Sequence, residues 1–269
     1  MPELPEVETV ARGLQKHVAG DVIESVWIGQ RHQPLKSTPD EIAAMLEGSR
    51  ITQARRVGKH IAIDLDRKDK AAGQWIVHLG MTGRMLVVPA DAPIEKHTHL
   101  IAKLHSGREL RFVDPRMFGK LAVTSEAFKA PGSEPLDVDF ENFAKLFRKR
   151  KTPIKSALLN QSLLSGVGNI YADEALARSG IRPRRRAASL TRSDLKRLYD
   201  NLKKVLHEAI KLGGSSVSDY VGADGERGFF QIKHLVYGRE GEPCRKCKTP
   251  IKRVVIGGRS SHYCPVCQK

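Results

Sequence analysis

Cysteine is missing from most of this 269-residue sequence, and none precedes Cys244. A disulfide framework would spread its cysteines over the fold that it holds together, so this distribution argues against one. The length is sufficient for two domains that each bury a core of their own. We therefore expect two packed domains rather than a disulfide-stabilised scaffold.

Long apolar runs are missing as well. None approaches the ~20 residues that a membrane-spanning helix needs, and the N-terminus lacks the basic and then apolar layout of a signal peptide. No internal repeat or low-complexity tract is present. These absences predict a soluble, cytoplasmic protein without a membrane partner.

Acidic residues are in deficit, because 30 Asp and Glu stand against 46 Lys and Arg, which gives a formal net charge of +16. Such an excess favours a polyanionic partner, and the phosphate backbone of DNA or RNA is the commonest one. An acidic membrane surface is the alternative. The basic runs 148–151 and 184–186 are typical of solvated faces and would add non-specific attraction to phosphate.

The cysteines that are present have the spacing C-x₂-C-x₁₆-C-x₂-C. Two thiolate pairs at this spacing form two knuckles that close a tetrahedral sulfur site, which suits zinc better than disulfides or free thiols. The sequence therefore predicts one structural Zn²⁺ in a C-terminal ribbon. Its predicted ligands are Cys244, Cys247, Cys264 and Cys267.

The N-terminal part is predicted to be mostly β. Residues 5–19 carry apolar side chains at helical spacing, and Thr38, Pro39 and Glu41 mark the start of a second helix. Short runs of branched residues between turn residues predict antiparallel strands without βαβ alternation. The fold class is therefore α+β, with an N-terminal β-sandwich or flattened barrel. The predicted strands are 22–28, 51–57, 61–65, 75–79, 85–88, 100–104, 110–113 and 121–124.

A linker is predicted at 130–135, where proline and glycine are concentrated, and the pattern after it is helical. The polar, glycine-containing residues 215–228 are interpreted as a mobile loop. The cysteine segment is interpreted as a zinc ribbon with a turn at Gly257-Gly258. The clearest predicted helices and strands of this part are 170–179, 191–212, 253–256 and 261–263.

The first six residues, Met1-Pro2-Glu3-Leu4-Pro5-Glu6, combine a proline after the initiator with two acids. Removal of Met1 would leave Pro2 with a free secondary amine, which titrates near ~8 and can attack an electrophilic carbon to form an iminium. Glu3 and Glu6 are then candidate proton donors and acceptors. The alternative is a plain helix start, with Pro5 at the first position and Glu6 complementing the helix dipole. Taken alone, these residues favour the helix start.

Two further positions suit phosphate, and a third carries a lysine to which no local pattern assigns a role. Gly166-Val167-Gly168-Asn169 separates two predicted helices, and amides at a helix start can bind phosphate, although a plain turn is as consistent. Arg259, at the tip of the ribbon, has a planar fork that matches phosphate, although a solvated turn residue is the usual case. Lys59 lies at a strand entrance, where a lysine is normally a surface residue.

Two predicted turns carry apolar residues among glycines: 78–84, with Met81, and 111–119, with Arg116 and Phe118. Such residues usually belong to a satellite core. On a DNA-binding face they could instead act as wedges that unstack bases and fill the hole left by an extruded nucleotide.

Taken together, these stretches resemble the bacterial formamidopyrimidine-DNA glycosylases, which are base-excision repair enzymes. The resemblance covers nearly the whole chain, from residues 1–8 through the two apolar turns and 166–174 to the ribbon. The related endonuclease VIII group shares the fold but typically begins Pro-Glu-Gly-Pro-Glu. Leu4 therefore favours the formamidopyrimidine branch.

The resemblance implies an N-terminal β-sandwich with flanking helices, a helix–two-turns–helix module and a zinc-ribbon hairpin. The implied domains are a catalytic domain at 1–132, a linker at 133–136, a helical domain at 137–236 with a lesion-closing loop at 215–228, and a zinc finger at 237–269. A bacterial protein associated with the nucleoid through DNA binding is implied, and a monomer is the family expectation.

The implied activity is that of a bifunctional DNA glycosylase and AP lyase. It would remove oxidised purines, such as 8-oxoguanine and formamidopyrimidines, from double-stranded DNA. By this similarity Pro2 attacks C1′ of the flipped nucleotide and forms a Schiff base, Glu3 protonates the sugar oxygen, and Glu6 assists proton transfer. β-Elimination and then δ-elimination follow.

The same resemblance adds Lys59 and Arg259 to the catalytic set, where they clamp the phosphates around the lesion together with Asn169. The implied DNA-binding residues that remain are His78 and those of the apolar turns. Of these, Met81, Arg116 and Phe118 would fill the gap left by the extruded base, with Arg116 facing the orphaned cytosine.

Three positions depart from the family pattern. Asn160 and Val113 stand where the family commonly has Asp and Asn or Asp, and Arg182 replaces a common His. None of them removes a proposed catalytic group, but the first two affect local hydrogen bonding.

Two other functions remain open. One is an endonuclease-VIII-like enzyme that prefers oxidised pyrimidines. The other is a zinc-ribbon DNA-binding protein without catalytic activity, which is disfavoured because the complete set of proposed catalytic residues is present.

Overall fold

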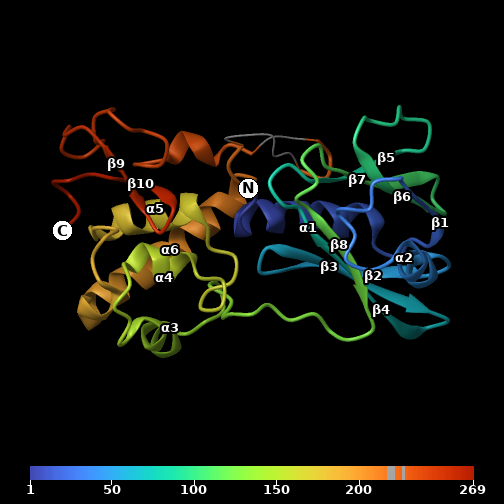
Figure 1. Cartoon of the computed structure of the whole chain (residues 1–269), viewed down its shortest axis with the longest axis horizontal. Coiled ribbons are helices and arrows are strands. Elements are labelled where there is room, and N and C mark those ends of the chain that lie inside the picture. Colours follow the sequence, from blue (N-terminus) through green and yellow to red (C-terminus); the bar gives the residue numbers. More distant parts are fainter. Residues whose placement is uncertain (217–221, 226–227) are drawn as a thin grey trace. The chain divides into compact units, whose positions relative to one another are not determined.

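The computed structural model describes residues 1–216, 222–225 and 228–269, and the chain divides into two compact units (Figure 1). The N-terminal unit comprises Met1–Lys129 together with Leu212–Phe229. The C-terminal unit comprises Ala130–Lys211 and Phe230–Lys269. None of the helices that the structure describes combines the length and apolarity that a membrane crossing requires.

The N-terminal unit contains two four-stranded sheets whose neighbouring strands are antiparallel, with the orders β1-β6-β7-β5 and β2-β3-β4-β8. Buried side chains from both sheets, including Trp75 and Phe112, belong to a single core. The predicted α+β class and each predicted strand are confirmed. The strands are β1 Ile23–Ile28, β2 Arg50–Val57, β3 His60–Arg67, β4 Lys70–His78, β5 Arg84–Pro89, β6 Thr98–Leu104, β7 Arg108–Val113 and β8 Lys120–Thr124.

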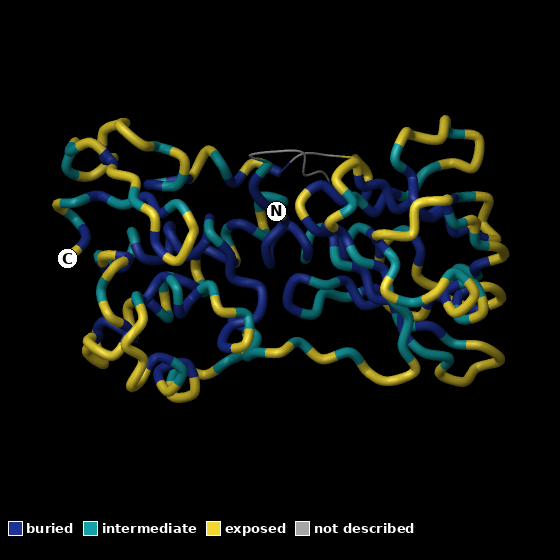
Figure 2. Tube along the Cα trace, viewed as in Figure 1, coloured by how far each residue is buried: buried dark blue, intermediate teal, exposed yellow. Residues whose placement is uncertain are grey.

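Helix α1 (Leu4–Val18) joins this core through one face, whose buried side chains include Val7, Val10 and Leu14 (Figure 2). Helix α2 (Pro39–Leu46) begins as its sequence predicts. The Thr38 hydroxyl accepts a hydrogen bond from the Glu41 N–H at 3.2 Å, and the Glu41 carboxylate accepts one from the Thr38 N–H at 2.7 Å. This reciprocal cap satisfies amides that the first turn leaves without helical partners.

Leu212–Phe229, which follow the helix Arg192–Lys211, belong to the N-terminal unit. No local sequence pattern predicts this return of the chain. Ala223 is 3% exposed and belongs to the core that α1 covers, and its carbonyl accepts a hydrogen bond from the Val87 N–H at 3.2 Å. A side chain at Gly13 of α1 would meet the Ala223 Cβ at 2.9 Å. Ala223 is therefore packed into the core rather than exposed. The mobility expected for 215–228 stays a prediction, and 217–221 and 226–227 lie outside the described residues.

The C-terminal unit contains the predicted helices and a two-stranded antiparallel hairpin. The helices are α3 Phe140–Phe147, α4 Ile154–Leu159, α5 Asn169–Ser179 and α6 Arg192–Lys211, with short 3-10 turns η1 Ala187–Ser189 and η2 Phe230–Lys233. The hairpin strands are β9 Lys252–Ile256 and β10 Arg259–Tyr263. Helix α5 ends at Gly180, whose φ of 69° is the left-handed conformation that favours glycine at a helix end.

Candidate active site and metal centre

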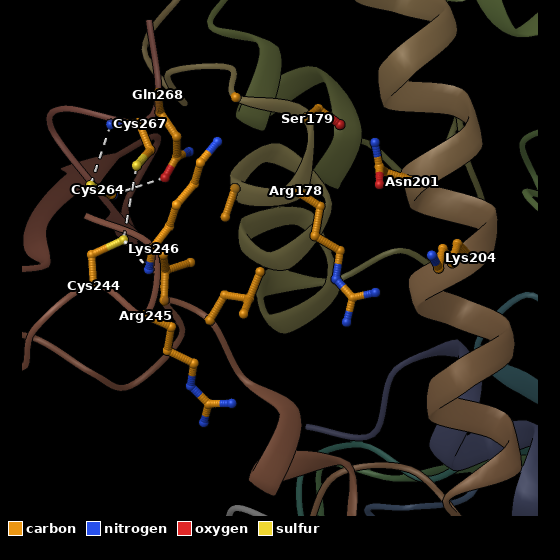
Figure 3. Close-up of a pocket in the computed structure, with 14 residues that line it drawn as sticks. Arg178, Ser179, Asn201, Lys204, Cys244, Arg245, Lys246, Cys264, Cys267 and Gln268 are labelled. Carbon is orange, nitrogen blue, oxygen red and sulfur yellow. Dashed lines mark hydrogen bonds between the residues drawn. The ribbon is translucent and has the colours of Figure 1, made fainter. Parts of the chain in front are cut away.

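The four cysteines meet at the base of the hairpin. One ligand atom from each of them lies within 4.8 Å of the others, and Figure 3 shows the Cys244, Cys264 and Cys267 side chains gathered beside one another. Backbone N–H groups of Lys246 and Cys267 each donate to a cysteine sulfur at 3.4 Å. Four sulfurs in two knuckles fit a tetrahedral zinc ion, and the donor set leaves no position open for catalysis.

A buried ion pair fixes the hairpin on the helices of the C-terminal unit. Lys155 of α4 and Asp173 of α5 are both 0% exposed, and their Nζ and Oδ1 atoms are 2.6 Å apart. Lys155 also donates to the Ser260 carbonyl at 2.6 Å, and Asp173 accepts from the His262 N–H at 2.9 Å. The ion pair and these two hydrogen bonds join β10 to α4 and α5. Removal of either charged partner would leave the other charge buried and uncompensated.

The same packing brings two of the predicted phosphate-binding elements together. Asn169 is the first residue of α5, and its Nδ2 donates to the Ser260 hydroxyl at 3.4 Å. Arg259 directly precedes Ser260 and is exposed at the tip of the hairpin. The start of α5 therefore contacts the residue that follows Arg259 in the hairpin. A helix N-terminus and an arginine are both suited to phosphate.

The N-terminal residues form a buried cluster of carboxylates at the start of α1. Pro2 is buried, and Glu3 and Glu6 are 3% and 2% exposed. Glu6 accepts the Glu3 N–H at 2.8 Å through Oε2 and the Ser215 N–H at 2.7 Å through Oε1. Glu3 is the N-cap of α1 and Glu6 lies in its first turn, so the interpretation as a helix start is compatible with the two acids lying close to Pro2 in the sequence.

Lys59 is held at the turn of the β2–β3 hairpin, where Gly58 has a φ of 62°. It is only 9% exposed, so the interpretation of a simple surface lysine is wrong. On the neighbouring strand, burial lowers the pKa of His78 to about 4, and the charges of His60 and Lys59 act in the same direction. His78 is therefore neutral near pH 7, and its Nδ1 accepts the Gly80 N–H at 3.1 Å.

The two apolar turns lie against each other and expose their apolar side chains. Met81 is 38% and Phe118 51% exposed, so neither belongs to a satellite core. The Arg116 guanidinium stacks over the Phe118 ring at 4.9 Å from its centroid. An exposed group of this kind can insert into a base stack.

Asp114 joins these turns, and the sequence had given it no role. It is fully buried and accepts hydrogen bonds from the Thr82 hydroxyl at 2.5 Å, the Arg116 N–H at 3.2 Å and the Gly119 N–H at 2.7 Å. One carboxylate therefore fixes the turns that carry Met81 and Arg116. An acid before a proline suggested only a local turn.

The three residues that depart from the family pattern are accommodated by their local surroundings. Asn160 accepts the Ser162 N–H at 2.9 Å through its Oδ1 and so closes a turn as an acid would. Val113 is buried in β7. Arg182 donates to the Gln268 and Pro265 carbonyls at 3.0 and 2.8 Å and thereby fastens the last cysteine knuckle.

The predicted residues are divided between the two units. The N-terminal unit contributes Pro2, Glu3, Glu6, Lys59, His78, Met81, Arg116 and Phe118. The C-terminal unit contributes Asn169, Arg259 and the four cysteines.

Sequence comparison finds three family matches in chain order. The formamidopyrimidine-DNA glycosylase N-terminal domain matches residues 1–121, and the H2TH domain of the same enzymes matches 131–221. The zinc finger found in FPG and IleRS matches 241–269. With the four adjacent sulfurs, this last match confirms the predicted structural zinc site.

Curated relatives cover the chain from end to end. A formamidopyrimidine-DNA glycosylase from Solibacter usitatus is 46% identical over 272 residues, with 100% of both chains covered. One from Thioalkalivibrio sulfidiphilus is 43% identical over 278 residues, again with 100% of both chains covered.

Solved structures of proteins named Fpg or MutM are similar to this chain in fold. The MutM (Fpg) protein of Thermus thermophilus has a TM-score of 0.87 at 40% identity and covers 99% of this chain and 98% of its own. A Lactococcus lactis Fpg mutant in complex with DNA containing Fapy-dG has a TM-score of 0.89 at 34% identity, with 100% of both chains covered. A MutM complex with DNA containing carbocyclic 8-oxo-G has a TM-score of 0.90 at 36% identity.

Proposed function

Because the chain belongs to the formamidopyrimidine-DNA glycosylase family, we propose that it is a bifunctional DNA glycosylase and AP lyase for oxidised purines in duplex DNA. The observation that carries the proposal is the buried cluster of Glu3 and Glu6 beside Pro2 at the start of α1. The division into 1–132, 133–136, 137–236 and 237–269 is part of the same proposal.

Pro2 is the proposed nucleophile, once Met1 has been removed. Its nitrogen attacks C1′ of the damaged nucleotide and forms a new C–N bond, while the glycosidic bond breaks and the base leaves. The amine proton passes to Glu6 and from there to the departing base, the bond between C1′ and the sugar oxygen opens, and protonated Glu3 donates its proton to that oxygen. The product is an iminium between Pro2 and C1′, with all atoms accounted for.

The lyase steps follow from the positive charge of the iminium, which acidifies the hydrogen on C2′. Loss of that proton breaks the C3′–O bond and releases the 3′ phosphate. A second elimination breaks the C5′–O bond, and hydrolysis by water returns the Pro2 amine. Phosphate leaving groups depart more readily when cations hold their charge.

Lys59, Asn169 and Arg259 are proposed to supply that charge and to hold the backbone on both sides of the lesion. Lys59 lies at a hairpin turn, and Asn169 at the start of α5 contacts Ser260, the residue next to Arg259 in the zinc hairpin. Met81, Arg116 and Phe118 are proposed to occupy the gap in the stack, since they are exposed on turns fixed by Asp114. His78 is proposed to contact DNA as a neutral donor.

Replacing Arg259 with alanine should weaken binding of lesion duplex by about 10-fold and reduce the salt dependence of binding by about one released counterion, because one phosphate contact is lost. Arg253→Ala is the matched control, since Arg253 is an exposed arginine of the same hairpin. Fluorescence anisotropy over a salt series measures both quantities. Equal effects of the two substitutions would contradict the assigned role of Arg259.

Lesion preference separates this proposal from an endonuclease-VIII-like activity. Excision is expected to be faster from duplex containing 8-oxoguanine than from duplex containing thymine glycol, in single-turnover assays at matched enzyme concentration. Faster excision of thymine glycol would assign the chain to oxidised pyrimidines instead.

A further inference from the structure

The segment that follows α6 supplies a direct partner for the N-terminal cluster. Ser215 lies 209 positions from Glu6 in the sequence, yet its N–H donates to Glu6 Oε1 at 2.7 Å. Ser215 is 4% exposed and Glu6 2%, so the bond is shielded from water. A shielded, charge-assisted hydrogen bond constrains its acceptor more strongly than an exposed one.

Both oxygens of Glu6 are engaged at once. Oε1 accepts the Ser215 N–H, and Oε2 accepts the Glu3 N–H at 2.8 Å. Two donors far apart in the sequence fix the plane of the carboxylate, because rotation about its last bond would lose both hydrogen bonds. The Glu3 donor belongs to the same helix start, whereas the Ser215 donor depends on how the chain returns.

Gly214 makes this return possible. Its φ is 80°, and a Cβ at this position would lie 2.8 Å from Glu6 Oε1, 2.9 Å from Glu6 Cγ and 3.2 Å from Glu6 Cα. Only glycine allows a backbone to approach the Glu6 side chain so closely. Gly213 has a similar φ of 72°, but among the described residues a Cβ there would meet only the Gly228 Cα, at an ordinary 3.5 Å.

We propose that Gly214 and the backbone N–H of Ser215 are positioning elements for Glu6, which set the carboxylate in the orientation that accepts the Pro2 proton. The proposal rests on the proposed role of Glu6 in the capture step. It assigns a function in the chemistry to a segment more than two hundred positions away from the N-terminus.

The test compares Gly214→Ala with Gly213→Ala, which carry similar backbone strain next to each other. Gly214→Ala should lower the single-turnover rate of 8-oxoguanine excision about 100-fold, as expected for a displaced catalytic group, with the duplex Kd within about threefold of the unmodified protein. Gly213→Ala should lower the rate by no more than about threefold. Equal losses in the two variants would overturn the proposal.

A double-mutant cycle with Glu6→Ala shows whether the effect passes through Glu6. In the Glu6→Ala background no carboxylate remains to be displaced, so Gly214→Ala should cause no further loss of rate. The same 100-fold loss in both backgrounds would contradict the proposal. If Gly214→Ala alone fails to fold, recovery of a cooperative melt in the Glu6→Ala background supports the contact, and failure in both backgrounds overturns it.

Failure of the underlying function gives a different result. If the unmodified protein forms no borohydride-trapped complex with 8-oxoguanine duplex, the proposed function itself is wrong. If it forms the complex and the two glycine variants behave alike, only the positioning role is lost.

Discussion

Replacement of Pro2 by glycine should reduce the borohydride-trapped complex with 8-oxoguanine duplex by about 100-fold or more, the range typical for loss of a group that acts in the chemical step. Glycine offers a primary amine without the ring that fixes the direction of the nitrogen. The Glu6 carboxylate is expected to remain in place, because it accepts hydrogen bonds from the Glu3 and Ser215 N–H groups, which the substitution leaves unchanged. The trapped fraction is measured by gel shift after reduction.

Pro5→Ala is the matched control for this substitution. Pro5 lies in the first turn of α1 and its carbonyl accepts a hydrogen bond from the Thr9 hydroxyl, an interaction that alanine retains. The control should trap at the level of the unmodified protein. Comparable trapping by Pro2→Gly and Pro5→Ala would show that the nucleophile is another amine.

Removal of zinc should have the second largest effect. The four sulfurs hold the base of the β9–β10 hairpin, and the tip of that hairpin carries Arg259. Structural zinc sites contribute directly to folding. Without the metal, the four thiols are no longer held together and the hairpin loses its support. Duplex affinity is expected to fall by about 10- to 100-fold, as for loss of one or two charge-assisted phosphate contacts.

The sandwich should survive this treatment, because the core that Trp75 and Phe112 share contains no residue of the hairpin. Metal content, circular dichroism of the β signal and duplex affinity are measured on the same sample, and Cys264→Ser provides a variant that lowers metal affinity without a chelator. Unchanged affinity after verified zinc loss would contradict the role of the hairpin.

Local patterns predicted much of this molecule because the interactions concerned are local. The cysteine spacing determines two knuckles whatever surrounds them, and the Thr38–Glu41 cap needs only one helical turn. Short runs of branched residues between turn residues likewise located the strands, since such residues pack well in a sheet. Their ends extended by a few residues where pairing with neighbours continued past the apolar run, as in β4.

Long-range contacts were not predictable from those patterns. Ser215 and Ala223 lie in a polar segment that resembles a loop, and only the folded chain places them on Glu6 and on α1. Lys59 is likewise buried, although its local pattern is that of a surface lysine. Sequence reasoning proposed the reactive residues, whereas the contacts of Ser215 with Glu6 and of Asp114 with the apolar turns came from the structure.

Localisation of the trapped adduct tests the central claim most directly. The intact mass of the unmodified protein is measured first, to establish that Met1 has been removed. The protein is then incubated with 8-oxoguanine duplex in the presence of borohydride, which reduces the iminium, and the digested product is sequenced by tandem mass spectrometry. We predict a sugar remnant on the nitrogen of Pro2 in the N-terminal peptide. An adduct on Lys59 or another lysine, or no adduct from protein whose N-terminus is Pro2, would contradict the account.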